Sequence, residues 1–288
     1  MKIQKIGIGI DFVGIAITRP KDIIVGYGED FDPTDKLFLG IIKILNGANY
    51  IIHNPNISWV NTGDEYASSN KKQIIVQLKS THLMKYGLSK VQEILNFLKE
   101  NKIPPKERRS RKKDQKVVKL NSYFQFTRLD FYLDLKMKMN VLALIGNGLG
   151  IKKSFNGLPK GCDIIQRQSV KSEKIIFKEL KIENQGFAFT IYNKKQEIVE
   201  KAKPEKFQLY PDIYRQTISD PESQLFRLEL RYFRSRSIYF NNFSSDQFKT
   251  LPVQELEKFK KKTKLLLKRK NNSKSSRLFQ KILGAVNG

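Results

Sequence analysis

The sequence predicts an α+β fold, a mainly antiparallel sheet flanked by helices and followed by a basic helical C-terminal extension. Three observations support this prediction. Two stretches, Phe124–Leu135 and Phe226–Tyr232, alternate apolar and polar residues as half-buried strands do. An amphipathic stripe of apolar residues begins after Ser89 and is typical of a helix that packs on a sheet. Lysines then surround a last apolar stripe that begins at Val253.

Taken in order, the chain predicts one α+β domain over residues 1–245, with two sub-repeats near 1–120 and 121–245, and an extension over 246–288. We expect strands over 3–18, 50–52, 57–60, 73–79, 124–135, 175–180, 187–192 and 226–232, and helices over 36–45 and from 89 to no later than 103. Ser89 and Gln92 have the spacing of a capping box. The stretch NTGDEYASSN and the passage between Pro204 and Pro221 are predicted to be loops. Pro252 suits the first turn of the C-terminal helix.

Charge is the extreme feature of the composition. The 288 residues hold 54 Lys+Arg against 28 Asp+Glu, a formal net charge of +26. An AT-rich genome raises the lysine content of a protein without functional reason, but it does not explain the low number of acidic residues. A polyanion is therefore the expected partner, with nucleic acid ahead of an anionic membrane. The single cysteine, Cys162, excludes an intrachain disulfide, and no apolar run reaches the roughly 18 residues of a membrane span. We expect a cytoplasmic protein.

The polar faces of the two alternating strands carry the candidate chemistry. Asp130 and Asp134 lie on one face of the first strand, and Glu229 lies on the corresponding face of the second. If both faces belong to one sheet surface, the three carboxylates converge and hold a divalent metal, Mg²⁺ or Mn²⁺, over a phosphodiester. The alternative is a pair of solvated strand faces with cross-strand ion pairs. The arginines beside these carboxylates are Arg128, Arg227 and Arg231.

Two segments are dense in lysine and arginine. Lys106–Lys116 contains no apolar residue and is predicted to be an exposed loop, either a phosphate-binding or a purely solvated one. The C-terminal helix adds a second basic surface. The candidate DNA-binding residues, including those on the strands, are Arg108, Arg109, Arg111, Lys112, Lys113, Lys194, Lys195, Arg227, Lys261, Lys262, Lys268 and Arg269.

Three short motifs, in this order and spacing, resemble the replication initiators of small rolling-circle plasmids and related phage or mobile-element initiators. The motifs are TRLDFYLDL, FTIYNKKQE and FRLELR, within roughly residues 70–240. The sequence departs from the family in lacking a clear Gly-Ser-Arg-x-Ser segment before the second motif. It also lacks the His-hydrophobic-His pair of the histidine-dependent nickases.

The resemblance implies a DNA-nicking and joining enzyme that acts at a replication origin. A tyrosine would attack one strand and remain linked to the 5′ phosphate, leaving a 3′ hydroxyl to prime synthesis. By motif position that tyrosine is Tyr192, with Tyr132, Tyr232 and Tyr239 as alternatives. Asp130, Asp134 and Glu229 would bind the metal, while Arg128, Arg227 and Arg231 would hold phosphates. Initiators of this kind often act as dimers and recruit a host helicase.

Two other hypotheses remain. A non-catalytic, sequence-specific DNA-binding protein would use the same sheet as a scaffold. An RNA-binding protein is a weaker hypothesis, because few aromatic residues stand beside basic ones for stacking on unpaired bases.

Overall fold

The computed structural model describes the sheet, five of the helices and the segments next to them. The described residues are 3–18, 36–46, 51–53, 59–62, 65–69, 73–80, 83–84, 87–106, 123–138, 163–171, 174–183, 186–201, 207–233, 245–268 and 284.

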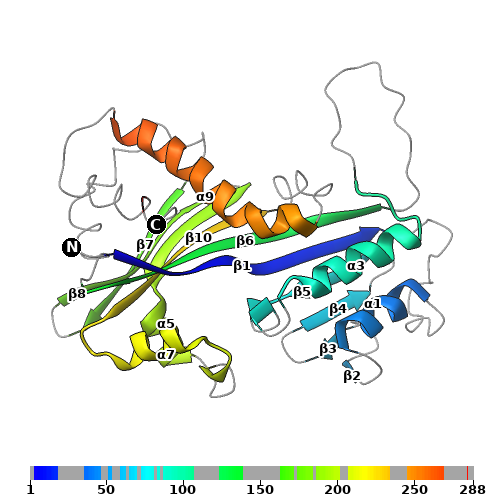
Figure 1. Cartoon of the computed structure of the whole chain (residues 1–288), viewed down its shortest axis with the longest axis horizontal. Coiled ribbons are helices and arrows are strands. Elements are labelled where there is room, and N and C mark those ends of the chain that lie inside the picture. Colours follow the sequence, from blue (N-terminus) through cyan, green and yellow to red (C-terminus); the bar gives the residue numbers. More distant parts are fainter. Residues whose placement is uncertain are drawn as a thin grey trace. The chain divides into compact units, whose positions relative to one another are not determined.

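Within these ranges, ten strands pair in the order β2-β3-β4-β5-β1-β6-β10-β9-β8-β7 (Figure 1). Their bounds are β1 Ile3–Thr18, β2 Ile51–His53, β3 Trp59–Thr62, β4 Glu65–Ser69, β5 Gln73–Leu78, β6 Tyr123–Met137, β7 Asp163–Lys171, β8 Lys174–Glu183, β9 Phe187–Asn193 and β10 Gln224–Phe233. β1 runs antiparallel to β5, and the successive pairs from β2 to β5 and from β7 to β9 are antiparallel as well. The predicted α+β class with a mainly antiparallel sheet is therefore confirmed.

The strand order is the same in the two halves of the chain. In the first half the last strand, β5, returns to pair with the long first strand, β1, and β4, β3 and β2 follow outward. In the second half β10 returns to β6, and β9, β8 and β7 follow in the same way. Each half is thus a meander whose final strand closes back on its opening strand.

The chain also divides into two compact units. The N-terminal unit comprises Asp11–Leu129 and Tyr232–Phe248, and the C-terminal unit comprises Met1–Ile10, Asp130–Arg231 and Lys249–Gly288. Three of the dividing points fall inside strands β1, β6 and β10. The prediction of sub-repeats near 1–120 and 121–245 stays a prediction.

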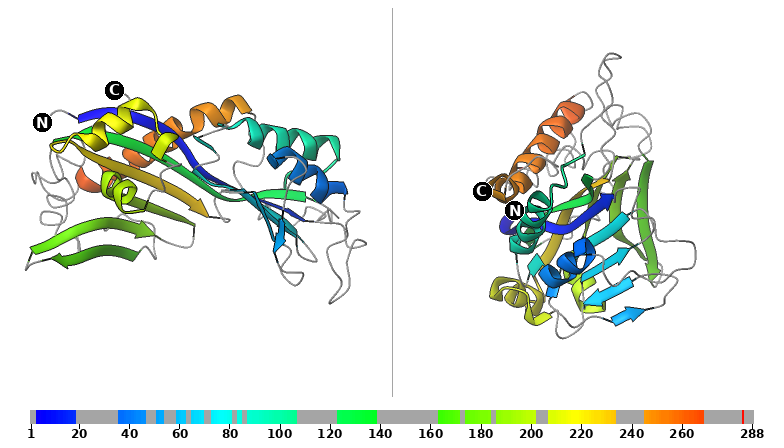
Figure 2. Two further views of the ribbon diagram at one scale, coloured as in Figure 1. Left: turned by 90° about the horizontal axis from the view of Figure 1, so that it is seen from below. Right: turned by 90° about the vertical axis from the view of Figure 1, so that its right-hand side faces the viewer.

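The helices of each unit pack against its strands. Their bounds are α1 Lys36–Asn46, α3 Ser89–Glu100, α5 Lys194–Lys201, α7 Asp212–Ser219 and α9 Ser245–Lys268. In the N-terminal unit α1 and α3 lie side by side over the strands (Figures 1 and 2). In the C-terminal unit α5 and α7 lie next to each other beside the sheet (Figure 1). None of the described helices is long and apolar enough to cross a membrane.

The period-two pattern of the two central strands places their apolar residues in the core. Phe131, Leu133 and Leu135 of β6 are fully buried, and so are Leu228 and Leu230 of β10. On the opposite faces Asp130, Asp134, Arg227 and Glu229 are buried too, while Arg231 is partly exposed, so both strands are more buried than the half-buried strands predicted. A sheet covered on both sides forces the charged residues of β6 and β10 to find partners inside the protein.

Several local predictions are confirmed and others are wrong. Helix α1, strand β5, helix α3 and the hairpin of β8 and β9 occur where the sequence predicts them. β4 lies within the stretch predicted to be a polar loop, α7 lies within the predicted loop passage, and β7 and α5 were not predicted. The N-cap of α3 is Leu88 and makes no side-chain cap, so the predicted capping box does not form. α9 begins at Ser245, and Pro252 lies inside it rather than in its first turn.

The approach of α1 to α3 depends on Gly40. A Cβ at this position would lie 2.1 Å from a ring carbon of Phe97. Only glycine lets the two helices come this close, because no side chain fits between the α1 backbone and the ring. The contact secures the helical layer of the N-terminal unit.

We expect Gly40→Ala to destabilise the protein by about 1–3 kcal/mol, because the added methyl group overpacks the interface with Phe97. This loss outweighs the gain in stability of up to about 1 kcal/mol that replacing glycine by alanine normally brings in a helix interior. Urea denaturation followed by circular dichroism measures the change. Lys43→Ala, at an exposed position of the same helix, is the control and should change stability by less than about 0.5 kcal/mol. Greater stability of Gly40→Ala would contradict the prediction.

Candidate active site

The polar faces of β6 and β10 lie on one surface of the sheet in the C-terminal unit. Arg227 contacts Asp134 and Arg231 contacts Asp130. Since the residue numbers rise along one strand as they fall along the other, the two strands are antiparallel. The single surface predicted from the alternation is therefore what the structure shows, but arginines stand between the carboxylates.

Asp134 and Arg227 form a buried ion pair with two parallel hydrogen bonds. Arg227 Nε donates to Oδ1 of Asp134 at 2.7 Å, and Nη2 donates to Oδ2 at 2.6 Å. The side chains are 0% and 4% exposed. The guanidinium face stacks on the Tyr132 ring, 4.2 Å from its centroid. One edge and the face of Arg227 are thus occupied, as a buried arginine requires, while among the described residues its Nη1 atom is buried and makes no hydrogen bond.

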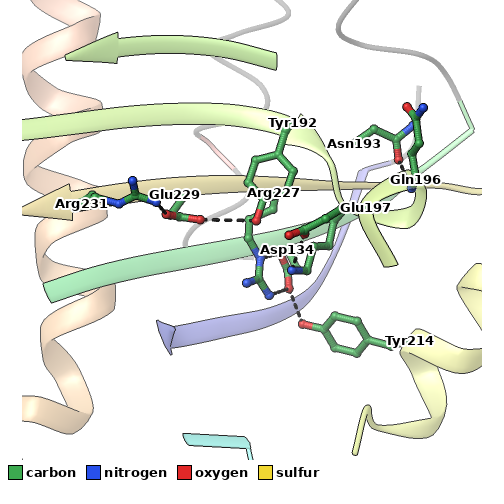
Figure 3. Close-up of polar contacts among 10 residues, drawn as sticks. Asp134, Tyr192, Asn193, Gln196, Glu197, Tyr214, Arg227, Glu229 and Arg231 are labelled. Carbon is green, nitrogen blue, oxygen red and sulfur yellow. Dashed lines mark hydrogen bonds and ion pairs between the residues drawn. The ribbon is translucent and has the colours of Figure 1, made fainter. Parts of the chain in front are cut away.

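Tyr214 of α7 donates a third hydrogen bond to this pair. Its hydroxyl lies 2.7 Å from Oδ2 of Asp134 (Figure 3). Burial, and next the negative charge of Asp134, raise the pKa of the Tyr214 phenol far above its ordinary value, so it remains a donor. Both oxygens of Asp134 are consequently engaged by groups from β10 and α7.

The glycines of β1 make room for this arrangement. A Cβ at Gly7 would lie 2.0 Å from the Tyr214 hydroxyl, and one at Gly9 would lie 3.0 Å from the Tyr132 ring. The Gly-Ile-Gly stretch therefore lets two tyrosines cross β1 at close range. It has no part in a nucleotide-binding loop, in agreement with the sequence, which lacks the third glycine of that fingerprint.

Arg231 joins the other two carboxylates. Its Nε donates to Oδ2 of Asp130 at 3.1 Å, and its Nη2 donates to Oε1 of Glu229 at 2.5 Å. Asp130 and Glu229 are buried, with side chains 2% and 7% exposed, whereas the Arg231 side chain is 26% exposed. Burial lowers the pKa of the Arg231 guanidinium, but the two carboxylates outweigh it and the net shift is upward.

Tyr192, at the end of β9, completes this second group. Its hydroxyl donates to Oε2 of Glu229 across 3.4 Å, so one carboxylate faces Arg231 with one oxygen and the phenol with the other (Figure 3). The phenol oxygen of the motif tyrosine therefore lies in the carboxylate–arginine network. We call Asp130, Arg231, Glu229 and Tyr192 the outer group, and Asp134, Arg227 and Tyr214 the inner group.

The residues after Tyr192 fix the start of α5. Asn193 Oδ1 accepts the backbone N–H of Gln196 at 3.0 Å as a helix cap does. Lys194 is buried, with its side chain 4% exposed, and donates to Glu197 at 2.6 Å. Lys195 donates to the backbone carbonyls of Asp220 and Ser223, just before β10. The motif YNKKQE thus builds a rigid strand-to-helix junction that orients the tyrosine.

The three predicted metal ligands do not form one cluster. No group of three or more acidic, histidine or cysteine side chains in the described part of the chain lies close enough to hold a metal ion. Asp134 is engaged by the inner group. Asp130 and Glu229 remain as a two-carboxylate donor set, and Mg²⁺ commonly uses one or two carboxylates together with water and substrate phosphates. The chemistry of these two residues therefore fits Mg²⁺ or Mn²⁺, and metal binding stays a prediction.

Of the other predicted site residues, Arg227 belongs to the inner group, and Nζ of Lys194 lies 5.8 Å from the centroid of the Tyr192 ring. Arg128 belongs to the N-terminal unit, where its guanidinium stacks 4.2 Å from the Phe12 ring centroid. Arg227, Lys194 and Lys195 make the internal contacts described above, so their predicted role in binding DNA stays a prediction. Lys261, Lys262 and Lys268 lie in α9, but their side chains fall outside the description. The remaining predicted DNA-binding residues, Arg108, Arg109, Arg111, Lys112, Lys113 and Arg269, lie outside the described residues.

Sequence reasoning missed Tyr214, Tyr132 as a stacking partner, and the two glycines. Tyr214 is 80 residues from Asp134 in the chain, within a stretch predicted to be loop. The one available signal was the Gly-Ile-Gly stretch in an otherwise apolar strand, because glycine in a strand often marks a close approach.

The sequence matches no protein-family model and no curated protein. Among solved structures it is similar to the rolling circle replication initiator protein from Geobacillus stearothermophilus. The superposition covers 89% of this chain and 85% of that one, at 10% sequence identity and a TM-score of 0.45.

We expect Tyr214→Phe to cost about 1.5–3 kcal/mol of stability at neutral pH, because it removes a buried hydrogen bond to a carboxylate. The raised pKa of Tyr214 means that its hydroxyl is neutral in the folded protein at a pH where an unfolded tyrosine, with its ordinary value of 10.0, ionises. The stability gap between wild type and variant should therefore narrow as the pH rises above that value.

Urea denaturation at neutral pH and at alkaline pH tests both parts of this prediction. Ser219→Ala, at an exposed position of α7, is the control and should show no comparable loss. A gap that is absent at neutral pH, or that widens at alkaline pH, would show that the hydroxyl does not stabilise Asp134.

Proposed function

We propose that this chain is a replication initiator that binds origin DNA and makes a metal-dependent single-strand nick with Tyr192 as the nucleophile. The observation that carries the proposal is the hydrogen bond between Tyr192 and Glu229 within the outer group. The motif order of the sequence and the net charge of +26 support it independently. The proposed partner is therefore DNA at a replication origin, and a host helicase and a second copy of the chain are further proposed partners.

In this proposal the phenol oxygen of Tyr192 attacks the scissile phosphorus. The phenol releases its proton as its oxygen bonds to the phosphorus, and the tyrosine–phosphate ester to the 5′ side forms as the bond to the 3′ oxygen breaks. That oxygen takes up a proton to leave a 3′ hydroxyl, so the step is balanced in protons. The ester conserves the energy of the broken bond for later rejoining. The capped start of α5 and the bond to Glu229 hold the phenol oxygen in place, which lowers the entropic cost of attack.

Asp130 and Glu229 are the residues proposed to hold Mg²⁺ or Mn²⁺. The metal would supply positive charge to the phosphate in the transition state. Arg231, which is half-buried beside both carboxylates, is proposed to bind a phosphate oxygen with its guanidinium. Asp134, Arg227 and Tyr214 support this group from the same surface of β6 and β10.

One observation favours a second candidate, a DNA-binding protein without nicking activity. Each of the three predicted metal ligands already accepts a hydrogen bond from an arginine. Such cross-strand pairs also occur where charged residues serve only to join strands. In that case the basic surfaces would bind the origin and the sheet would be a scaffold.

A nicking assay separates the two candidates. Supercoiled DNA that carries the gene's own upstream and internal sequence is incubated with protein and Mg²⁺ or Mn²⁺, or with EDTA, and run on a denaturing gel. The proposed function predicts a metal-dependent nick with protein attached to a 5′ end, and peptide mapping that identifies Tyr192. Origin binding without a nick under every metal condition would support the second candidate.

We expect Tyr192→Phe to lose nicking by at least about 10³-fold with the fold and DNA binding retained, because the nucleophile is absent and one weak hydrogen bond is lost. Asp130→Asn should also lose nicking while binding survives, as it removes a proposed metal ligand but keeps the shape. Gel-shift and melting measurements accompany the nicking assay. Tyr210→Phe, a change of the same kind in α7's neighbourhood, is the control and should nick normally. Normal nicking by Tyr192→Phe would exclude Tyr192 and direct the search to Tyr132, Tyr232 and Tyr239.

A further inference from the structure

Two arginines pair with the three buried carboxylates of β6 and β10, and they differ in how firmly they are held. Arg227 is 4% exposed, makes two parallel bonds to Asp134 and lies against the Tyr132 ring. Arg231 is 26% exposed and divides its bonds between Asp130 and Glu229, one nitrogen to each. Arg227 is therefore fixed on its edge and its face, whereas part of Arg231 is open to solvent.

We propose that Arg231 is an exchangeable counterion: it holds Asp130 and Glu229 in the metal-free protein and yields them to a divalent cation, while its guanidinium turns to a DNA phosphate. This inference rests on the proposed function, because it concerns the same two carboxylates. It adds a regulatory step, in which the protein keeps its metal ligands together before metal and DNA arrive.

Charge balance explains why the exchange would couple the binding of the divalent cation to the binding of a DNA phosphate. Asp130, Glu229 and Arg231 carry a formal charge of −1 together, so the group attracts a cation. With a divalent cation the sum becomes +1, and a single phosphodiester returns it to zero. A buried site tolerates a net charge poorly, so bound metal favours bound phosphate and the reverse. Arg231 stays close enough to supply the guanidinium fork that suits phosphate oxygens.

The inner group makes the exchange possible without unfolding the strands. Arg227 and Tyr214 hold Asp134 from two directions, so β6 and β10 remain joined when Arg231 leaves. A structural arginine and a movable arginine thus stand four residues apart on β10.

Mn²⁺ binding to the full chain without DNA tests the proposal independently of nicking. The signal of free Mn²⁺ in electron paramagnetic resonance gives the dissociation constant. We expect Arg231→Met to bind Mn²⁺ at least about tenfold more tightly than wild type, because it removes a competing positive charge from the carboxylates. Arg215→Met is the matched control, since Arg215 also pairs with a carboxylate, Asp212, but on the surface of α7. It should change the affinity less than about threefold, as expected for an exposed pair.

Mn²⁺ binding by Arg231→Met that is equal to or weaker than that of wild type would overturn the exchange. An equal gain in affinity for Arg215→Met would also overturn it, because the gain would then reflect only the change in net charge. If Arg231→Met does not fold, Arg231→Lys serves instead. It keeps the charge but loses the fork that reaches both carboxylates, and tighter binding than wild type is again expected. Failure of wild type and all variants to bind Mn²⁺ would overturn the metal site and the exchange together.

The salt dependence of DNA binding tests the second half of the exchange. A single-stranded oligonucleotide is titrated against the protein with Mn²⁺ and with EDTA, in a Tyr192→Phe background that prevents covalent attachment. In Mn²⁺, Arg231→Met should lower the slope of log affinity against log salt by about 0.7, the value for one phosphate contact on a single strand. In EDTA the slopes should agree. Equal slopes in Mn²⁺, or a difference that persists in EDTA, would show that Arg231 does not move to phosphate on metal binding.

Discussion

The buried ion pair of Asp134 and Arg227 is the constraint on which the rest of the C-terminal unit depends. A carboxylate without solvent contact is several kcal/mol unfavourable unless charge and hydrogen bonds are both supplied. Arg227 supplies the charge from the neighbouring strand, and Tyr214 supplies a further donor from α7. The position of α7 and the glycine at residue 7 of β1 follow from this need, because the Tyr214 hydroxyl has to pass where a Cβ would otherwise stand.

Beside this fixed pair, the outer group has the features of a site at which chemistry takes place. Its carboxylates are buried, but its arginine reaches solvent, and its tyrosine stands at the junction between β9 and the capped helix α5. Functional groups work best when rigid neighbours hold them, and the inner group is such a neighbour on the same two strands. The arrangement separates a firmly held pair, Asp134 and Arg227, from the residues to which we assign reactivity, which are Tyr192, Glu229, Asp130 and Arg231.

The period-two alternation of β6 and β10 was sufficient to predict two strands, their core residues and a shared polar surface. It was not sufficient to predict which charged groups pair, because pairing depends on the register between strands that are about 100 residues apart. The contact of Tyr214 with Asp134 could not be predicted either, because the alternation of polar and apolar residues carries no information about a contact from a helix 80 residues away. The boundaries of α9 were wrong because proline is most common in the first turn of a helix, yet here tertiary packing accommodates Pro252 further in.

The first half of the sheet reaches the same strand order without charges at the corresponding place. β5 closes the first half of the sheet as β10 closes the second, and the sequence of β5, QIIVQL, contains no charged residue. Ile74, Val76 and Leu78 are fully buried there, whereas the interior of β10 includes Arg227 and Glu229. Replacing buried ion pairs by apolar residues is often neutral or stabilising, so stability alone gives no reason to keep them. The strand order alone therefore does not account for the charges of β10, and this is the pattern expected where a fold carries groups for another purpose.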